Sequence, residues 1–280
     1  MENPAVDIEN AGITDVWAQL PTARFWREKW LASLMRWTRD EAPTADTPVE
    51  ALIAAMDEAG VSMSFISGWS SPKGDLISND DVEAAINAAP ARLKGVIGAD
   101  ISEPMEAVRE IRRRAKTGKF VGVRIIPWLW DLPPNDRRYY PVYAACVDAG
   151  LPFCTQIGHT GPLKRSETGR LIPYLEDVMI DFPELKIVGG HVGFPWLDEV
   201  RTMIRKFPNF YIDTSAYALH RLPADFVELM KGEGRDRIMF GTNFPMLTAS
   251  RCLEKLDALG LDEAGRQAFL GGNARRVFGI

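Results

Sequence analysis

The sequence is poor in cysteine and histidine, with three of each among 280 residues. Cys146, Cys154 and Cys252 are too few and too far apart for a disulfide framework or a zinc ribbon. No apolar run approaches the roughly 20 residues that a helix needs to cross a bilayer. The polar start, MENPAVDIEN, lacks the features of a signal peptide. We therefore expect a cytoplasmic protein that does not enter a membrane.

The sequence also lacks an excess of positive charge. It has 33 basic and 38 acidic residues, which gives a net charge of −5. The strongest basic run, REIRRRAKTGK at residues 109–119, is typical of the solvated face of a helix. Because no basic stripe is present, nucleic acid is not an expected partner, and a small-molecule substrate is.

What the sequence does contain is a regular alternation of short apolar runs and amphipathic stretches. The runs predicted to be strands span residues 13–20, 61–68, 93–99, 121–127, 152–158, 186–193, 210–215 and 238–243. Amphipathic segments such as MEAVREIRRRAKTG separate most of them, which favours parallel pairing through right-handed crossovers. Eight such units in a chain of this length predict an α/β fold, a single (β/α)8 TIM barrel over residues 1–280.

One segment, residues 21–48, exceeds the plain barrel because it separates the first strand from its helix. In RFWREKWLASLMRW, four apolar side chains are spaced to share one helical face: Trp26, Trp30, Leu34 and Trp37. This face predicts packing in the core or in a homodimer, while its place after the first strand would also suit a lid. Residues 262–280 are expected to form a final helix, a glycine turn and a short closing helix.

Function in such barrels gathers at the C-terminal ends of the strands, and two histidines fall there. Imidazole titrates near neutrality, so His191 and His159 are candidates for general acid/base catalysis. Asp213 could orient a histidine or act as a base. Each histidine also has a structural interpretation, because a buried imidazole often only bonds to the backbone and the glycines beside His159 are typical of a tight turn.

Arg124 is unusual because a barrel strand is covered on both faces, so a charged side chain within it needs a partner. Its guanidinium could hold a substrate carboxylate through two parallel bonds, or form an ion pair with Asp15 or Asp100. Arg165, in the loop after the fifth strand, could help to bind an anion, although loop arginines are commonly solvated. Both arginines are expected substrate-binding residues.

The segments GGHVGFPWLDEV, FYIDTSAY, FGTNFP and FLGGNARRVFGI, in this order, resemble the amidohydrolase-related family. The resemblance covers most of the chain. It implies a metallo-dependent-hydrolase barrel, in a family whose members include decarboxylases, lactonases and hydratases acting on small carboxylated rings. Members that use a metal carry a His-x-His pair in strand one, a histidine in strand five and an aspartate in strand eight. Here those positions hold Trp17, Gln19, Gln156 and Asn243, and only the strand-six His191 is kept.

These departures argue against a bound divalent cation. An indole cannot ligate a metal, and neutral carboxamides are weak ligands for transition metals. We therefore predict no metal and no other cofactor. The alternative is a rebuilt site made from His159, His191 and Asp213.

The three amides that replace the ligands, together with Trp17, are expected to line the barrel mouth. Buried amides must be hydrogen-bonded, so they pair with each other, with water or with a ligand. They form either a polar cradle for a substrate carbonyl or carboxylate, or a neutral plug that only maintains the mouth. The residues concerned are Gln19, Gln156 and Asn243.

Three functions stay open. The first expectation is a metal-independent hydrolase acting on a lactone or similar ester of a small carboxylated cyclic or unsaturated compound. In it, His191 or Asp213 would activate water, while the amides and Arg124 would stabilise the oxyanion. The alternative is a decarboxylase or related lyase, in which a histidine protonates a carbanion. The second alternative is a non-catalytic ligand-binding barrel, against which the two strand-end histidines argue.

Overall fold

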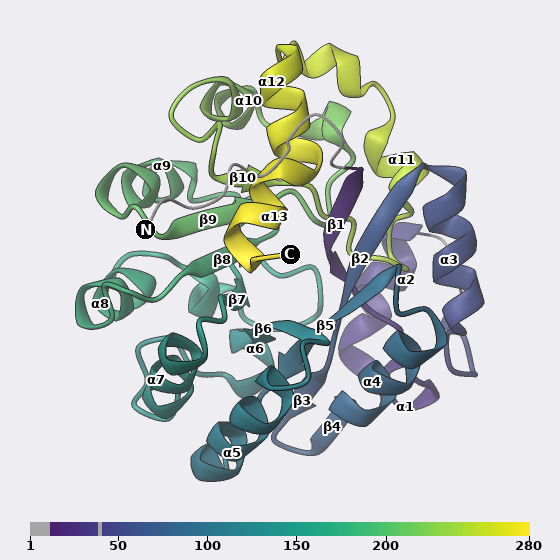
Figure 1. The fold of residues 1–280 in the computed structure, drawn as a ribbon, viewed down its shortest axis with the longest axis vertical. Helices are drawn as coiled ribbons and strands as arrows, with labels where there is room; N and C mark the ends of the chain where they lie inside the picture. The colour runs from purple at the N-terminus through teal and green to yellow at the C-terminus, as the bar shows by residue number, and fades with distance from the viewer. Residues whose placement is uncertain (1–11, 39–40) are drawn as a thin grey trace.

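The computed structural model describes residues 12–38 and 41–280 (Figure 1). Its main sheet has eight parallel strands, which are β1 (Ile13–Ala18), β2 (Val61–Ser67), β5 (Leu93–Gly98), β6 (Phe120–Arg124), β7 (Phe153–Gln156), β8 (Ile187–Gly190), β9 (Phe210–Asp213) and β10 (Ile238–Met239). Their order in the sheet is their order in the chain, as successive right-handed βα units produce. The predicted (β/α)8 barrel is confirmed.

The ring closes between β10 and β1 through backbone hydrogen bonds rather than through a long ladder. The amide of Val16 donates to the carbonyl of Phe240 at 3.0 Å, and the amide of Asn243 donates to the carbonyl of Trp17 at 2.7 Å. The predicted eighth strand, residues 238–243, is therefore regular only at Ile238–Met239. Its last residues bend across the end of β1, where polar side chains gather.

Helices surround the barrel wall (Figure 1). Those between the strands are α3 (Val49–Glu58), α4 (Asn79–Ala88), α5 (Pro104–Ala115), α7 (Tyr140–Ala149), α8 (Tyr174–Asp181), α9 (Leu197–Lys206) and α10 (Ala224–Lys231). Most of the basic run lies on α5, where Arg109, Arg112 and Arg113 are exposed, as predicted for a solvated helix face. Arg114 differs from this prediction, because it is buried and pairs with Glu83 and Glu110. Among the described residues, no helix is both long and apolar enough to cross a membrane.

The loops carry shorter turns of helix, and the chain ends on a continuous helical stretch. The loop turns are α6 (Pro127–Trp130), Glu167–Gly169, Leu219–Arg221, α11 (Ala249–Leu253) and Leu256–Leu259. The final stretch consists of α12 (Glu263–Gln267), a π-helical turn (Ala268–Gly272) and α13 (Asn273–Phe278). The expected glycine turn is therefore wrong: Gly271 and Gly272 lie inside the helix, because a π turn absorbs the change of direction.

Helix α13 closes the N-terminal end of the barrel (Figure 1). Ala274, Val277 and Phe278 pack against inward-facing strand residues, and the rings of Phe278 and Phe65 meet edge-on at 4.8 Å between centroids. This apolar floor excludes water from the lower half of the barrel. Polar chemistry is thereby confined to the opposite end, where the strands terminate.

Two features differ from the sequence expectation. The insertion is not one helix but α1 (Ala23–Trp26), a 3₁₀ turn (Lys29–Leu31) and α2 (Ala32–Thr38), because Glu28 has an extended backbone. The four apolar side chains expected on one helical face are thus split between elements. An antiparallel hairpin, β3 (Trp69–Ser71) and β4 (Gly74–Ile77), was not expected, and its Trp69 packs edge-on to Phe25 of the insertion at 5.2 Å.

Candidate active site

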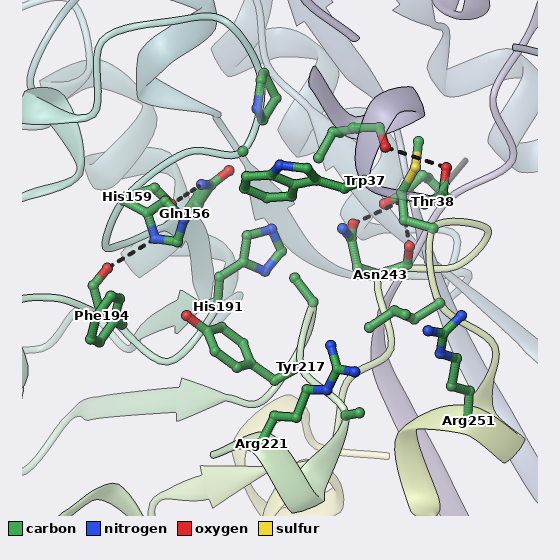
Figure 2. Close-up of a pocket in the computed structure, with 18 of the residues that line it drawn as sticks. Trp37, Thr38, Gln156, His159, His191, Phe194, Tyr217, Arg221, Asn243 and Arg251 are labelled. Atoms are coloured by element: carbon green, nitrogen blue, oxygen red, sulfur yellow. Dashed lines mark hydrogen bonds between the residues drawn. The ribbon is translucent and has the colours of Figure 1, made fainter. Parts of the chain in front are cut away.

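A cavity of about 1130 Å³ lies at the C-terminal end of the barrel. Polar side chains line it from the strand ends and the loops that follow: Gln19, Gln156, His159, His191 and Asn243. Its apolar wall comes from the insertion, the hairpin and α6, and includes Phe25, Trp30, Trp37, Trp69 and Trp128. The insertion thus covers the cavity, which is where a lid would lie. Figure 2 shows His191 amid these side chains, between Trp37 and Tyr217.

Two of the three amides bind each other. The Gln19 Nε2 atom donates to the Asn243 Oδ1 atom at 3.0 Å. Asn243 has a left-handed backbone, with φ of 70°, which asparagine tolerates better than most residues and which turns its side chain toward β1. The Oε1 atom of Gln19 is buried and has no hydrogen-bond partner within the described part of the chain, so it is the acceptor that this pair offers.

The third amide belongs to a separate network. The Gln156 Oε1 atom accepts a bond from the Trp128 indole at 2.7 Å, and its Nε2 atom donates to the His159 carbonyl at 3.2 Å. Both ends of this amide are therefore occupied. Gln156 therefore lines the cavity with the other two amides, as expected, but does not bond to them, because it fixes α6 and the following loop instead.

Trp17 and Arg124 fill the interior of the barrel below the cavity. Both are buried, and the Arg124 guanidinium carbon lies 3.6 Å from the centroid of the Trp17 ring, a close cation–π stack. Gly190 makes room for the indole, since a Cβ atom there would approach the Trp17 ring to 2.3 Å. The stack seals the barrel between its floor and its mouth.

Several expected contacts are corrected by this arrangement. Arg124 and Trp17 do not line the cavity, so neither is placed to touch a substrate there. Arg124 donates instead to the Val16 carbonyl at 3.3 Å, and among the described residues it has no salt bridge with Asp15 or Asp100. Arg165 is exposed and also lies outside the cavity wall, because its loop points it toward solvent.

His191 connects the cavity to a buried carboxylate. Its Nδ1 atom lies 2.6 Å from the Ser215 Oγ atom, and that hydroxyl in turn bonds to the Asp213 Oδ1 atom. The Ser215 amide also donates to Asp213 Oδ1, at 2.9 Å. Asp213 is completely buried and does not line the cavity, so it can act on a substrate only through His191.

The backbone around this chain of hydrogen bonds is strained. His191, Val192 and Ala216 all have positive φ angles, of 73°, 66° and 66°. Left-handed backbone is unfavourable for side chains with a Cβ atom, and most of all for a β-branched valine. Such strain persists where the surrounding structure fixes a side chain. Here it turns the His191 imidazole away from the strand and into the cavity.

Burial shifts the pKa values of the two titratable groups that this series of hydrogen bonds connects, Asp213 and His191. Desolvation raises the pKa of Asp213 to about 6, although the Ser215 hydroxyl and amide and the charge of Arg124 oppose this. Desolvation, followed by the positive charges of Arg124 and His159, lowers the pKa of His191 to about 3. His191 is therefore a neutral imidazole at physiological pH. One of its ring nitrogens carries a hydrogen that it can donate, and the other can accept one.

His159 lies at the cavity wall but is held by its surroundings. Its amide donates to the Phe194 carbonyl at 2.7 Å, and its Nδ1 atom lies 3.4 Å from the same carbonyl. The preceding Gly158 has a φ angle of 82°, which is the tight turn that its glycine neighbours indicated. A role for His159 as a second proton carrier stays a prediction.

Sequence reasoning missed Ser215, the residue that links His191 to Asp213. The signal was present in YIDTSAY, because residues two apart on a strand share a face and Asp213 and Ser215 have this spacing. Arg251 and Tyr217 were also missed, and they line the cavity with Arg221, a loop arginine (Figure 2). No sequence pattern marks these loop side chains, because their position depends on how the loops fold back.

A family model described as Amidohydrolase matches residues 14–280. The chain is 22% identical to a gamma-resorcylate decarboxylase from Polaromonas sp. strain JS666 over 251 residues, which cover 72% of this chain and 74% of that protein. Among solved structures, it resembles an uncharacterized TIM-barrel protein from Bordetella bronchiseptica, with a TM-score of 0.77, 24% identity and coverage of 95% and 99% of the two chains.

A further solved structure contains a metal. It is a dihydroxybenzoic acid decarboxylase from Polaromonas sp. JS666 with bound manganese and the inhibitor 2-nitroresorcinol, with a TM-score of 0.69, 19% identity and coverage of 96% of this chain and 97% of the other. Its manganese raises the question of whether the side chains at this barrel mouth fit a divalent cation.

The donor set does not fit one. An indole fills the barrel beside Gly190, and the guanidinium of Arg124 lies directly behind it as a fixed positive charge. The amide oxygens of Gln156 and Asn243 already accept hydrogen bonds. Across residues 12–38 and 41–280, no three His, Cys, Asp or Glu side chains are grouped to hold a metal ion. The alternative of a rebuilt site from His159, His191 and Asp213 is therefore wrong.

Proposed function

The chain belongs to the amidohydrolase family, and from this premise we propose that it is a carboxy-lyase acting on a small aromatic carboxylic acid without a metal. The observation that carries the proposal is the position of the His191 imidazole, which lines an aromatic-walled cavity and is backed by Ser215 and Asp213. Both relatives described above that have a stated activity are decarboxylases of dihydroxybenzoates.

The cavity suits a planar ring with an acidic group. Trp30, Trp37 and Trp128 provide flat apolar surfaces against which a ring can pack. Arg221 and Arg251 line the same cavity and bring positive charge to it (Figure 2). Within the described residues, neither guanidinium has a salt bridge, so both are available to a carboxylate.

Decarboxylation of such an acid requires a proton at the ring carbon that bears the carboxylate. His191 would supply it from Nε2, since Nδ1 is held by Ser215. The C–H bond then forms, the C–C bond breaks, and its electron pair returns to the ring as carbon dioxide leaves. The apolar wall keeps water from the site and favours the release of a neutral gas over a charged ground state.

Hydrolysis of a lactone, the first expectation from the sequence, is less well supported than this alternative. It would use the same imidazole in the opposite direction, with Nε2 taking a proton from water. The amide pair suits it poorly, because the buried atom of the pair that lacks a partner among the described residues is an acceptor, Gln19 Oε1, and an oxyanion needs donors. The named relatives favour the carboxy-lyase. The experiment that tests the carboxy-lyase therefore also measures hydrolysis, as the competing reaction.

The test is a substrate panel measured with and without a chelator. The purified chain is incubated with 2,6-dihydroxybenzoate, 5-carboxyvanillate and 2-pyrone-4,6-dicarboxylate, and carbon dioxide and ring-opened product are both followed. We expect carbon dioxide from an aromatic acid, in the presence of EDTA as in its absence. Ring opening without carbon dioxide would establish the hydrolase instead. Tight binding with no turnover of any compound would establish the non-catalytic barrel.

A further inference from the structure

The hydrogen-bonded chain from Asp213 to His191 allows two arrangements of its hydrogens. A serine hydroxyl carries a single hydrogen, so Ser215 cannot donate to Asp213 and to His191 at once. When Asp213 is ionised it accepts the hydroxyl hydrogen, and Ser215 Oγ must accept from His191 Nδ1–H. The imidazole then carries its hydrogen on Nδ1, and Nε2 is bare at the cavity.

The opposite arrangement holds when Asp213 is protonated. The carboxylic acid donates to the Ser215 Oγ atom, the hydroxyl turns and donates to His191 Nδ1, and the imidazole hydrogen lies on Nε2. Both arrangements give a partner to Asp213 Oδ1, Ser215 Oγ and His191 Nδ1 with the same heavy-atom positions, and in both Asp213 Oδ2 has no partner among the described residues. The protonation of a completely buried carboxylate thereby sets which nitrogen of a cavity-lining histidine holds a hydrogen.

We propose that Ser215 is a proton relay between Asp213 and His191, so that His191 changes tautomer, not charge, when it transfers a proton in the cavity. This proposal rests on the proposed function and names how the proton is supplied. Ser215 and Asp213 are positioning residues in it, because neither lines the cavity, whereas His191 does.

In the carboxy-lyase reaction, each hydrogen that leaves one group is taken up by the next. The Nε2–H bond of His191 breaks as the C–H bond forms on the substrate carbon. The Ser215 Oγ–H hydrogen moves to Nδ1, and the hydrogen of the Asp213 carboxyl moves to Oγ. The imidazole stays neutral throughout, and the net change is one proton from Asp213 to the substrate. A solvent proton taken up through Nε2 restores the starting state.

The surroundings support a carboxyl-held proton. Facing the chain are Arg124 from β6, Cys154 from β7, Asp15 from β1 and His159 from the loop after β7. Burial dominates at both ends: it raises the pKa of Asp213 to about 6 and lowers the pKa of His191 to about 3. Between pH 5 and 7 a proton added to this chain therefore settles on the carboxyl, not on the imidazole.

The direction of the pH dependence separates the two reactions. A carboxy-lyase needs the protonated chain, so turnover falls as the pH rises through about 6, the pKa of Asp213. A hydrolase needs bare Nε2, so its turnover rises through the same pH. A failure of the proposed function is thus distinguishable from a failure of the relay.

Nitrogen-15 NMR of the imidazoles tests the relay without any substrate. The chain has only three histidines, so the His191 signals are assigned by difference with His191→Asn. We expect neutral His191 from pH 5 to 8, with hydrogen on Nε2 below about pH 6 and on Nδ1 above it. In Ser215→Ala and in Asp213→Asn we expect one tautomer at every pH. A single tautomer in the native protein, or an imidazolium forming near pH 6.5, would overturn the relay.

Turnover provides the second readout. Ser215→Ala should lower kcat by about 100-fold, because His191 loses its proton supply, while KM stays unchanged. It should also abolish the limb near pH 6, which a merely structural role for Ser215 would leave in place. Ser215→Thr keeps the hydroxyl and should restore both. A limb that persists in a folded Ser215→Ala protein contradicts the proposal.

Discussion

The two halves of the barrel mouth differ in how their side chains are held. On the side of β1, β6 and β7, Trp17, Arg124 and Gln156 are buried and locked by stacking or by bonds at both ends. On the side of β8 and β9, His191 opens into the cavity and its chain of hydrogen bonds can rearrange. We call these the sealed half and the open half.

The comparison divides one end of the barrel into a half that is packed for stability and a half that is suited to the proposed chemistry. In the sealed half, Gln156 is bonded at both ends of its amide, and Trp17 and Arg124 stack on each other outside the cavity wall. This half therefore offers little to a ligand. The open half contains the strained backbone at His191, Val192 and Ala216. It also contains the Asp213 carboxyl, whose pKa is raised, and the His191 imidazole, whose pKa is lowered. Substitutions in the first should change folding, and substitutions in the second should change turnover.

The largest expected effect is in the open half. His191→Asn removes the proton carrier while keeping a polar side chain of similar width, and kcat should fall by about 10²–10⁴-fold. Binding of an unreactive analogue such as 2-nitroresorcinol should persist, as measured by calorimetry. Equal loss of binding and turnover would mean that His191 holds the ligand and does not move a proton.

In the sealed half, Trp17→Ala should lower the free energy of unfolding by about 3–5 kcal/mol, because the indole is fully buried above Arg124. Trp37→Ala is the matched control, since Trp37 is 65% exposed and its removal should change stability by about 0.5 kcal/mol or less. Guanidinium denaturation measures both. Similar losses for the two variants would contradict the division into halves.

A smaller change is expected for Gln156→Leu. The substitution leaves the Trp128 indole N–H and the His159 carbonyl without partners, at a cost of about 1–3 kcal/mol in unfolding free energy. KM for the substrate should change little, because this amide has no free group to offer. A large rise in KM without loss of stability would place Gln156 in the substrate site after all.

Arg124→Met tests whether the sealed half acts electrostatically on the open half. The arginine charge lowers the pKa of Asp213 and that of His191, so removing it should raise both. The falling limb of the pH–turnover profile should therefore move to higher pH. Arg165→Met, which removes an exposed charge outside the cavity, should leave the limb where it is. A limb that stays where it is in Arg124→Met would show that the Arg124 charge does not act on Asp213.

The smallest expected effect concerns metal removal. Extensive dialysis against EDTA should change neither kcat/KM nor the midpoint of thermal unfolding, because an indole and occupied amides stand where ligands would be needed. Elemental analysis of the native protein should find metal well below one ion per chain. Activity that disappears on chelation and returns with manganese would contradict this.

The sequence was sufficient to predict the barrel because buried parallel strands are nearly continuous apolar runs, and eight of them could be counted. Their ends were less clear. The run at residues 238–243 is apolar enough to be a strand, but closure onto β1 bends it after Met239. The hairpin at Trp69–Ser71 and Gly74–Ile77 escaped notice because its strands are short and lie outside the barrel ladder.

At the site, residue type predicted position only in part. His191 and the amides of Gln19 and Asn243 reach the cavity as expected. Arg124 does not, because the sequence cannot show that Trp17 lies between it and the mouth. Ser215 was overlooked because a serine in the turn after a strand is unremarkable until its neighbours are placed. Contacts between strands distant in sequence decide these cases, and no local pattern records them.

Helix α13 gives the molecule an order of assembly. Phe278 rests on Phe65, so the inner ends of the strands stay open to water until synthesis has passed the last turn of this helix. A ribosome-bound chain that carries all eight strands still lacks the cap that dries its interior. The inner ends of the strands can therefore become dry only after residues 273–278 have left the exit tunnel.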